Sequence, residues 1–404
     1  MNNWASERLG DVLTFAKAGG TPSTSSEQYY GGSIPFVSIE DITNSKKWIT
    51  KTKKCLSEEG LRSCSAWLVA KGDLLYSMYA TLGKVRMAGL PLCTNQAIIA
   101  LRSEKNKVLP EYLYYYLEHL EPEISRVASQ TTQANLNARI VKSLPIRYPV
   151  ELCEQRRIAG LLSAVDEQVE AVSLQATKQE EVCKAIEVDL LRRIAQTAER
   201  RQIGSFAEVG GGKRLPAGHD YSQFPTGLRY LRVTDFFEQT VDFHSLQSLQ
   251  NETFHALRRY ELQPRDLYIS IAGSIGWAGV MPKLDTPRVI LTENAARIRL
   301  EEETVNPDYL ALFINSELGQ QQIEERIGTG GGVPKLALER IRTIQVALPD
   351  EAKQRDTAAF IVKLRDGVRA LRAEQAKLML LKSGLARQLL MPEKPAAEVR
   401  SAAQ

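Results

Sequence analysis

The amino-acid sequence predicts an α+β fold in which two similar globular domains are separated by two long antiparallel coiled-coil helices, with pseudo-twofold symmetry. Two observations predict this fold class. The landmarks of the first half recur in the same order in the second half, at a distance of about 195–200 residues. Each half also ends in a long segment whose apolar residues repeat with heptad spacing. A repeat of this length indicates duplicated domains rather than a solenoid.

The duplication is clearest in two similar phrases. Residues 73–85 read DLLYSMYATLGKV, and residues 266–280 read DLYISIAGSIGWAGV. Each phrase predicts two short strands joined at a glycine, Gly83 or Gly276, where the chain turns tightly. Three further pairs keep the same order along the chain: TNQAIIALRSE with TENAARIRLEE, LPEYLYYYLEH with NPDYLALFINSE, and EQRRIAGLL with KQRDTAAFI.

The pattern divides the chain into five segments. Globular domains are expected over residues 1–150 and 198–349, each with short strands, a helix with proline in its first turn, and a closing strand. Long helices are expected over 151–197 and 350–391, and residues 392–404 are expected to form a flexible tail.

Each long segment carries one apolar seam whose steps alternate between four and three residues, as in a coiled coil. Two matching seams in one chain most simply pack on each other, and a helix lying alone on its own domain is the alternative. Polar residues interrupt both seams, which can fix the register of the pair. The seam positions are Ile158, Leu162, Val165, Val169, Val172, Ala176, Gln179, Cys183, Ile186 and Leu190 in the first segment, and Ile361, Leu364, Val368, Leu371, Gln375, Leu378, Lys382, Leu385 and Leu389 in the second.

The composition predicts a cytoplasmic protein without a membrane span. The 404 residues carry a net charge of +4, which permits nucleic-acid binding without requiring it. The five cysteines form no C-x-x-C pair, as is typical of free thiols in a reducing compartment. No apolar run has the length of a signal peptide or a membrane helix. The four histidines show no metal-binding spacing, so we expect no metal site.

Polar loops near the repeated phrases have side chains suited to nucleic acid, and two such domains match the two half-sites of a duplex. Glycine loops with cations allow close approach to phosphates. Stretches SQTTQAN (129–135) and GTGGGVPK (328–335) are rich in donors that can bind base edges. Ordinary polar loops would have the same composition. The candidate DNA-binding residues are Lys17, Thr21, Ser77, Tyr79, Thr81, Lys84, Gln130, Thr132, Gln133, Asn135, Lys213, Arg214, Ser270, Ser274, Trp277, Thr329 and Lys335.

The duplicated phrase, the TNQA and TENA steps, the PEYL and PDYL helix starts, and the EQ and KQ entries to long helices resemble the specificity subunits of type I restriction–modification systems. The resemblance covers nearly the whole chain. It implies that each globular domain is a target-recognition domain, which reads one half of a bipartite, asymmetric site on double-stranded DNA. It also implies that the long helices are spacers that dock two methyltransferase subunits. In the family these subunits methylate adenine N6 with S-adenosylmethionine, and nuclease/translocase subunits join them for restriction.

The resemblance further implies that the chain itself has no catalytic centre and binds no cofactor. The stretch Asn306-Pro307-Asp308-Tyr309 lacks the second proline of an adenine-methyltransferase loop and is better explained as a helix start. No convincing glycine-rich cofactor loop follows a strand. Two alternatives remain open: a fused DNA adenine methyltransferase with diverged motifs, and a coiled-coil scaffold that binds no DNA.

Overall fold

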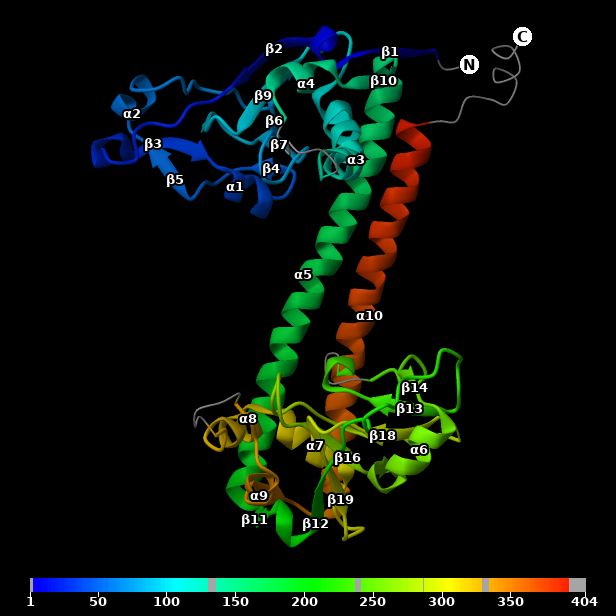
Figure 1. Ribbon diagram of the computed structural model, residues 1–404. Helices are drawn as coiled ribbons and strands as arrows, with labels where there is room; N and C mark the ends of the chain where they lie inside the picture. Colours follow the sequence, from blue (N-terminus) through cyan, green and yellow to red (C-terminus); the bar gives the residue numbers. More distant parts are fainter. Residues whose placement is uncertain (1–2, 130–135, 237–240, 286, 329–333, 392–404) are drawn as a thin grey trace, which may run out of the picture. The chain divides into compact units, whose positions relative to one another are not determined.

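The computed structural model describes residues 3–129, 136–236, 241–285, 287–328 and 334–391 (Figure 1). It divides into two compact units. Unit 1 comprises Met1–Ser173 with Ala373–Gln404, and unit 2 comprises Leu174–Arg372. Each unit holds one globular α+β domain and a stretch of both long helices. The predicted class of two similar α+β domains with long coiled-coil helices is confirmed. The predicted tail, residues 392–404, lies outside the described residues.

The domain of unit 1, called domain 1, contains three sheets. Strands β1 and β10 pair with each other and join the start of the domain to its end. The main sheet has the order β2-β9-β6-β7-β4, and the third sheet has the order β5-β3-β8. The strands are β1 Trp4–Arg8, β2 Leu13–Ala18, β3 Tyr30–Val37, β4 Trp48–Ile49, β5 Lys54–Leu56, β6 Leu74–Ser77, β7 Val85–Ala88, β8 Cys93–Thr94, β9 Ile98–Ser103 and β10 Pro145–Pro149.

Helix α3 (Pro110–Ser129) supplies much of the core of domain 1. Proline occupies its first position, where a missing N–H is not needed, and Tyr112 and Tyr115 are buried among leucines and valines of the main sheet. The hydroxyl of Tyr112 donates to the carbonyl of Arg147 at 2.9 Å, which ties α3 to β10. The other helices are α1 Ile39–Asn44, α2 Glu58–Arg62 and α4 Ala138–Ser143, with short 3-10 turns at Leu9–Val12 and Glu27–Tyr29.

Domain 2, in unit 2, repeats this plan with small differences. Its strand pairs are β11-β20, the sheet β12-β19-β16-β17, and the sheet β14-β13-β18-β15. Tyr309 of α7 donates to the carbonyl of Ala347 at 2.7 Å, as Tyr112 does in domain 1. The strands are β11 Glu199–Gln202, β12 Ala207–Gly211, β13 Leu228–Leu231, β14 Gln247–Ser248, β15 Glu261–Leu262, β16 Leu267–Ser270, β17 Ala278–Val280, β18 Arg288–Leu291, β19 Ala295–Leu300 and β20 Gln345–Leu348.

The helices of domain 2 break where domain 1 has one continuous α3. Helix α7 (Pro307–Asn315) ends at Ser316, whose side chain caps α8 (Glu317–Glu324) by accepting from the N–H of Gly319. Serine at this position satisfies a free N–H at the start of the new helix. The remaining helices are α6 Asn251–Leu257 and α9 Leu338–Arg342, with 3-10 turns at Ile203–Ser205, Val233–Asp235 and Arg258–Tyr260.

The two long helices are α5 (Leu152–Thr197) and α10 (Glu351–Leu390). All predicted seam positions on both helices are buried or half-buried. In unit 2, Glu187 pairs with Arg365 at 2.8 Å, and the earlier Glu180 pairs with the later Arg372 at 3.2 Å. Residue numbers therefore run in opposite directions along the paired stretches, which makes the pair antiparallel.

Lys382 shows why a cation is tolerated in the seam of α10. In unit 1 its ammonium lies 2.6 Å from Asp166 of α5 and 2.7 Å from Glu118 of α3. Burial lowers the pKa of Lys382, but the charges and hydrogen bonds of the two carboxylates more than offset burial and raise that pKa. The buried charge is thus compensated by two partners from two different helices.

A buried glutamine joins each long helix to its own domain. The side-chain oxygen of Gln155 accepts from the N–H of Leu109 at 2.8 Å, and its nitrogen donates to the carbonyls of Lys107 and Pro149. Gln354 repeats these contacts with Asn306, Thr304 and Pro349. The EQ and KQ motifs noted in the sequence therefore fix the start of each long helix against its domain.

Among the described residues, the structure contains no helix with the length and apolarity needed to cross a membrane.

The first prediction concerns the buried aspartate of the repeated phrase. Asp266 accepts two hydrogen bonds from Arg299, at 2.8 and 2.6 Å, and one from the N–H of Gln263 at 2.7 Å. We expect Asp266→Asn to lower the free energy of unfolding by about 2–3 kcal/mol, because it leaves a charged guanidinium opposite a neutral amide. Chemical denaturation measures this loss. The exposed Glu303→Gln is the control and should change stability little.

Candidate nucleic-acid interface

The repeated phrase forms the same turn in both domains. After β6, the backbone of Ser77 exchanges hydrogen bonds with Lys84 and Gly83, and its hydroxyl donates to the carbonyl of Thr81. After β16, Ser270 makes the matching bonds to Trp277 and Gly276, and its hydroxyl donates to the carbonyl of Ser274 at 2.5 Å. We call these segments, residues 77–84 and 270–277, the reading turns.

The backbone of each reading turn requires glycine at one position. Gly83 and Gly276 have φ values of 81° and 93°, a region that side-chain-bearing residues rarely adopt. Three residues earlier, Ala80 in domain 1 also has positive φ, at 60°, where domain 2 has Gly273 at 77°. The two turns therefore share one backbone conformation despite their different sequences.

The side chains of the reading turns divide into buried and exposed sets. Ser77 and Ser270 are completely buried and bond within the turn. Thr81 is half-buried, and its hydroxyl has no hydrogen-bond partner among the described residues. Tyr79 is 40% exposed and Trp277 is 36% exposed. A direct DNA contact by the buried serines stays a prediction, and the proposal below does not depend on it.

Lys84 and Trp277 occupy the same place in the two turns, immediately after the glycine. Lys84 is half-buried near Glu121 of α3. Burial raises the pKa of Glu121, and the charges of Lys84 and Arg86 oppose this rise. The turn of domain 1 therefore has a cation, Lys84, at the position where the turn of domain 2 has the indole of Trp277. The two turns share a backbone conformation but differ in side-chain chemistry.

The residue that follows each donor-rich stretch bonds to a reading turn through its backbone. The N–H of Leu136 donates to the carbonyl of Met78 at 3.0 Å, and the N–H of Leu336 donates to that of Ile271 at 3.0 Å. Lys335 is exposed and pairs through its backbone with Ala272. The side chains predicted in these stretches at Gln130, Thr132, Gln133, Asn135 and Thr329 lie outside the described residues.

The glycine loops pack against the TNQA and TENA steps. A Cβ atom at Gly19 would lie 1.8 Å from the carbonyl oxygen of Thr94, and one at Gly212 would lie 2.0 Å from that of Thr292. These glycines therefore permit close packing inside each domain. The sequence had instead predicted that they allow a phosphate to approach the loop. Whether the loops also approach a phosphate stays a prediction.

The polar residues beside these glycines already have partners. The hydroxyl of Thr21 donates to Gln96 at 2.5 Å, and Arg214 pairs with Glu293 at 2.8 Å. Lys17 lies 5.9 Å from the ring centroid of Trp67. The backbone of Lys213 donates to Leu291 and accepts from the hydroxyl of Tyr230.

Sequence reasoning missed the partners Gln96 and Glu293. Both lie in the TNQA and TENA steps, which were recognised as a repeat but not as part of the site. The two steps differ at their second and third residues. This difference could have indicated a functional position, because residues that vary within a repeated motif often carry the difference in function between its copies.

Trp277 also lines a cavity of about 1020 Å³ in unit 2, between domain 2 and the long helices. Cys183, Arg365 and Asn315 contribute to its lining. In unit 1 the seam cation Lys382, Asp166 and Glu118 hold the corresponding elements together. Among the described residues, no group of three or more histidine, cysteine or acidic side chains is arranged to hold a metal ion.

The comparisons with known proteins identify the family of the first half. The family model described as "Type I restriction modification DNA specificity domain" matches residues 1–182. Residues 1–182 are therefore similar to the type I specificity domain family. The resemblance found in the sequence is thereby confirmed.

Curated relatives of the specificity family give the same result. The type I restriction enzyme MjaIX specificity subunit of Methanocaldococcus jannaschii is 30% identical over 193 residues, which cover 47% of this chain and 43% of the relative. The HindI specificity subunit of Haemophilus influenzae is 29% identical over 151 residues, which cover 36% of this chain and 32% of the relative. The matches therefore span less than half the length of these relatives.

Solved structures of type I specificity proteins share the fold of the whole chain. The crystal structure of the type I restriction–modification S subunit from M. genitalium aligns with a TM-score of 0.60 at 16% identity, over 97% of both chains. A structure from a study of complex assembly and conformational transition of the type I system also aligns with a TM-score of 0.60 and 16% identity, over 97% of this chain and 98% of that chain. These likenesses concern the fold alone.

The second prediction tests the glycine contact of the specificity domain. We expect Gly19→Ala to lower the free energy of unfolding by about 3 kcal/mol, because the new methyl group would overlap the carbonyl of Thr94. Gly160→Ala on α5 is the matched control. Its Cβ would meet no atom within 4 Å, so this change should stabilise the helix by up to about 1 kcal/mol. Thermal or chemical unfolding of both variants measures the difference.

Proposed function

We propose that the whole chain is the DNA sequence-specificity subunit of a type I restriction–modification enzyme. Each domain reads one half of a bipartite, asymmetric site on double-stranded DNA. The observation that carries this proposal is the presence of two reading turns with one backbone conformation and different exposed side chains. Two similar but non-identical turns suit two half-sites of different sequence.

Domain 2 is included because its internal contacts match those of the family-matched domain 1. The aspartate–arginine pair, the serine-held turn, the tyrosine bond to the closing strand and the buried glutamine all recur. The family model stops at residue 182, so these contacts support the same role for the remainder of the chain. The likeness in fold to S subunits over 97% of this chain agrees with this assignment.

The long helices are proposed to dock two methyltransferase subunits. Large apolar side chains are exposed on both helices at matching places: Leu161 corresponds to Phe360, and Val182 corresponds to Leu381. Unit 1 holds Leu161 and Leu381, and unit 2 holds Phe360 and Val182. Exposed apolar side chains that gather into a patch are typical of partner-binding surfaces. Each unit therefore holds one residue of each matched pair, and two equivalent sets of exposed residues fit two copies of one partner.

The chemistry is proposed to reside in these partners. They would transfer a methyl group from S-adenosylmethionine to adenine N6, while this chain selects the sequence and binds no cofactor itself. Nuclease/translocase subunits would join the same assembly for restriction.

The third prediction assigns one half-site to each reading turn. In the chain assembled with its methyltransferase partners, we expect Trp277→Ala to reduce base discrimination roughly tenfold in one half-site only. Lys84→Ala should act on the other half-site only, because the two side chains lie in different domains. Methylation of a randomised DNA library, read by sequencing, reports both half-sites at once.

These two variants serve as controls for each other. A loss spread over both half-sites in either variant would contradict the assignment of one turn to one half-site. Methylation of the library by the unmodified assembly with no sequence preference would overturn the proposed function and favour a scaffold that binds no specific DNA. S-adenosylmethionine binding by the isolated chain would favour the fused methyltransferase.

The fourth prediction concerns docking. We expect Leu161→Asp combined with Leu381→Asp to reduce the assembly from two methyltransferase subunits to one, because a charge replaces apolar contact at one of the two sites. Phe360→Asp combined with Val182→Asp should remove the other subunit. Native mass spectrometry counts the subunits. The control is Leu68→Asp, an equally exposed leucine in domain 1, which should leave two subunits bound.

A further inference from the structure

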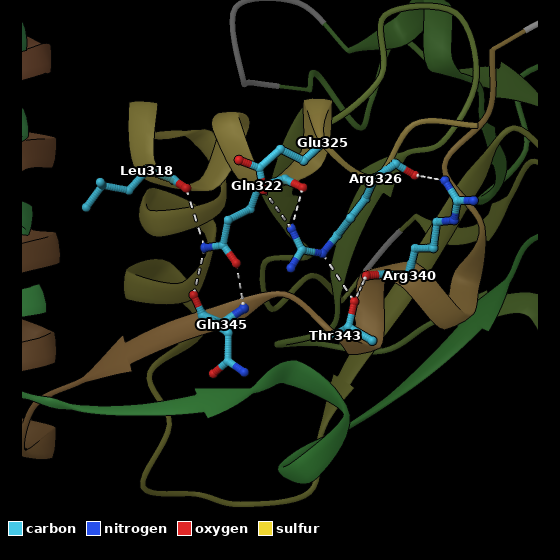
Figure 2. A network of polar contacts seen from close by, with 7 residues as sticks. All are labelled: Leu318, Gln322, Glu325, Arg326, Arg340, Thr343 and Gln345. Atoms are coloured by element: carbon cyan, nitrogen blue, oxygen red, sulfur yellow. Dashed lines mark hydrogen bonds and ion pairs between the residues drawn. The ribbon is translucent and has the colours of Figure 1, made fainter. Parts of the chain in front are cut away.

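A network of polar contacts in domain 2 joins residues that precede the second donor-rich stretch to residues that follow it (Figure 2). Arg340 of α9 donates from Nη1 to the carbonyl of Arg326 at 2.6 Å. Arg326 in turn donates from Nη1 to the carbonyl of Gln322 at 2.7 Å, and from Nε to the hydroxyl of Thr343 at 3.2 Å. The hydroxyl of Thr343 donates to the carbonyl of Arg340 at 2.9 Å. The two arginines thus connect the last turn of α8 to the middle of α9 and to Thr343, which follows α9.

Gln322 anchors this network to the closing strand. Its side-chain nitrogen donates to the carbonyl of Gln345 at 2.9 Å, and its side-chain oxygen accepts from the N–H of Gln345 at 2.9 Å. The amide therefore pairs with both backbone groups of the first residue of β20, as a neighbouring strand would (Figure 2). This pairing fixes Gln322, whose carbonyl accepts from Arg326, relative to β20.

The network continues through the backbone to the reading turn. Arg326 lies two residues before Gly328, and Gly328 donates from its N–H to the carbonyl of Lys335 at 3.2 Å. Lys335 pairs with Ala272, and Leu336 donates to Ile271. A displacement of Arg326 would therefore move Gly328, Lys335 and the start of the reading turn, at Ile271 and Ala272, together.

Domain 1 cannot form the same network. The shared numbering of Leu136 and Leu336, 200 residues apart, places Ile140 at the position of Arg340 and Pro145 at the position of Gln345. Isoleucine has no donor for a carbonyl, and proline has no N–H for a glutamine side chain. The support of the reading turn is thus specific to domain 2.

We propose that Arg326 and Arg340 are positioning residues for DNA recognition by domain 2. They touch no DNA in this role; they hold Lys335 and the reading turn at residues 270–277 in the geometry that selects bases. Base readout depends on donor and acceptor placement within hydrogen-bond range, so a small shift of the turn changes which bases fit. This inference rests on the proposed function, and it adds determinants of specificity for one half-site.

The experiment uses the full-length chain assembled with its methyltransferase partners and a randomised DNA library. We expect Arg340→Ala to reduce base discrimination roughly tenfold in the half-site that Trp277→Ala alters, and to leave the other half-site unchanged. Arg340→Lys retains one donor for the carbonyl of Arg326 and should restore most of the discrimination. A purely structural role would instead lower methylation of all sites in proportion to the folded fraction.

Arg342→Ala is the matched control, because it removes the same side chain from the same helix. Arg342 donates to Val209 and pairs with Glu339, so this variant should keep both half-sites. Amide hydrogen exchange gives a second readout: Arg340→Ala should speed exchange at Gly328 and Leu336, while Arg342→Ala should not.

The outcomes separate the inference from the proposed function. If the unmodified assembly selects a bipartite site and Arg340→Ala leaves both half-sites intact, the inference is wrong and the function stands. Equal loss of discrimination with Arg340→Ala and Arg342→Ala would also overturn the inference. If the unmodified assembly selects no sequence, the proposed function itself fails.

Discussion

The buried amide of Gln155, with its counterpart Gln354, is the contact on which the arrangement of each unit depends. Each amide joins three elements: the end of the closing strand, the chain before the core helix, and the first turn of the long helix. Because the glutamine is buried, a lost partner would leave a polar group without water, at a cost of about 1–3 kcal/mol. The long helix therefore leaves its domain in one fixed direction. Within each unit, this direction determines how the reading turn is held relative to the helix surface that partners would bind.

The residues shared by the two domains and those that differ have separate tasks. The shared residues are buried and bond within their own domain, as Asp73 with Arg102 and Asp266 with Arg299 show. The residues that differ lie at or near the surface of the turns and loops. Lys84 of domain 1 and Trp277 of domain 2, which occupy equivalent positions, are an example. A duplicated scaffold with changed surface residues would let one protein read the two different half-sites proposed above with a single type of fold.

Local patterns predicted the long helices well, because heptad spacing depends only on residues along the same segment. The repeat also predicted which parts of the two domains correspond, because similar segments can be aligned from the sequence without structural information. The candidate site was harder. Ser77 and Ser270 were chosen for polarity, but each is buried in a strand that pairs with β9 or β19, and these strands are more than 15 residues away along the chain. Arg326 and Arg340 were missed for the same reason, because their contact joins residues on either side of the second donor-rich stretch.

The modest net charge of +4 arises because 48 aspartates and glutamates nearly balance 52 lysines and arginines, and many of these opposite charges lie in contact. Several arginines of the two domains form ion pairs with carboxylates of the same domain. These carboxylates partly neutralise the arginine charges, which leaves less positive charge for phosphates. Binding to DNA gains affinity from each phosphate that a free cation neutralises. A chain with its cations paired in this way is suited to the proposed selection of bases, and in the proposed assembly the docked partners would supply the phosphate contacts that hold the duplex. The paired arginines are Arg102, Arg201, Arg214, Arg232, Arg288 and Arg299.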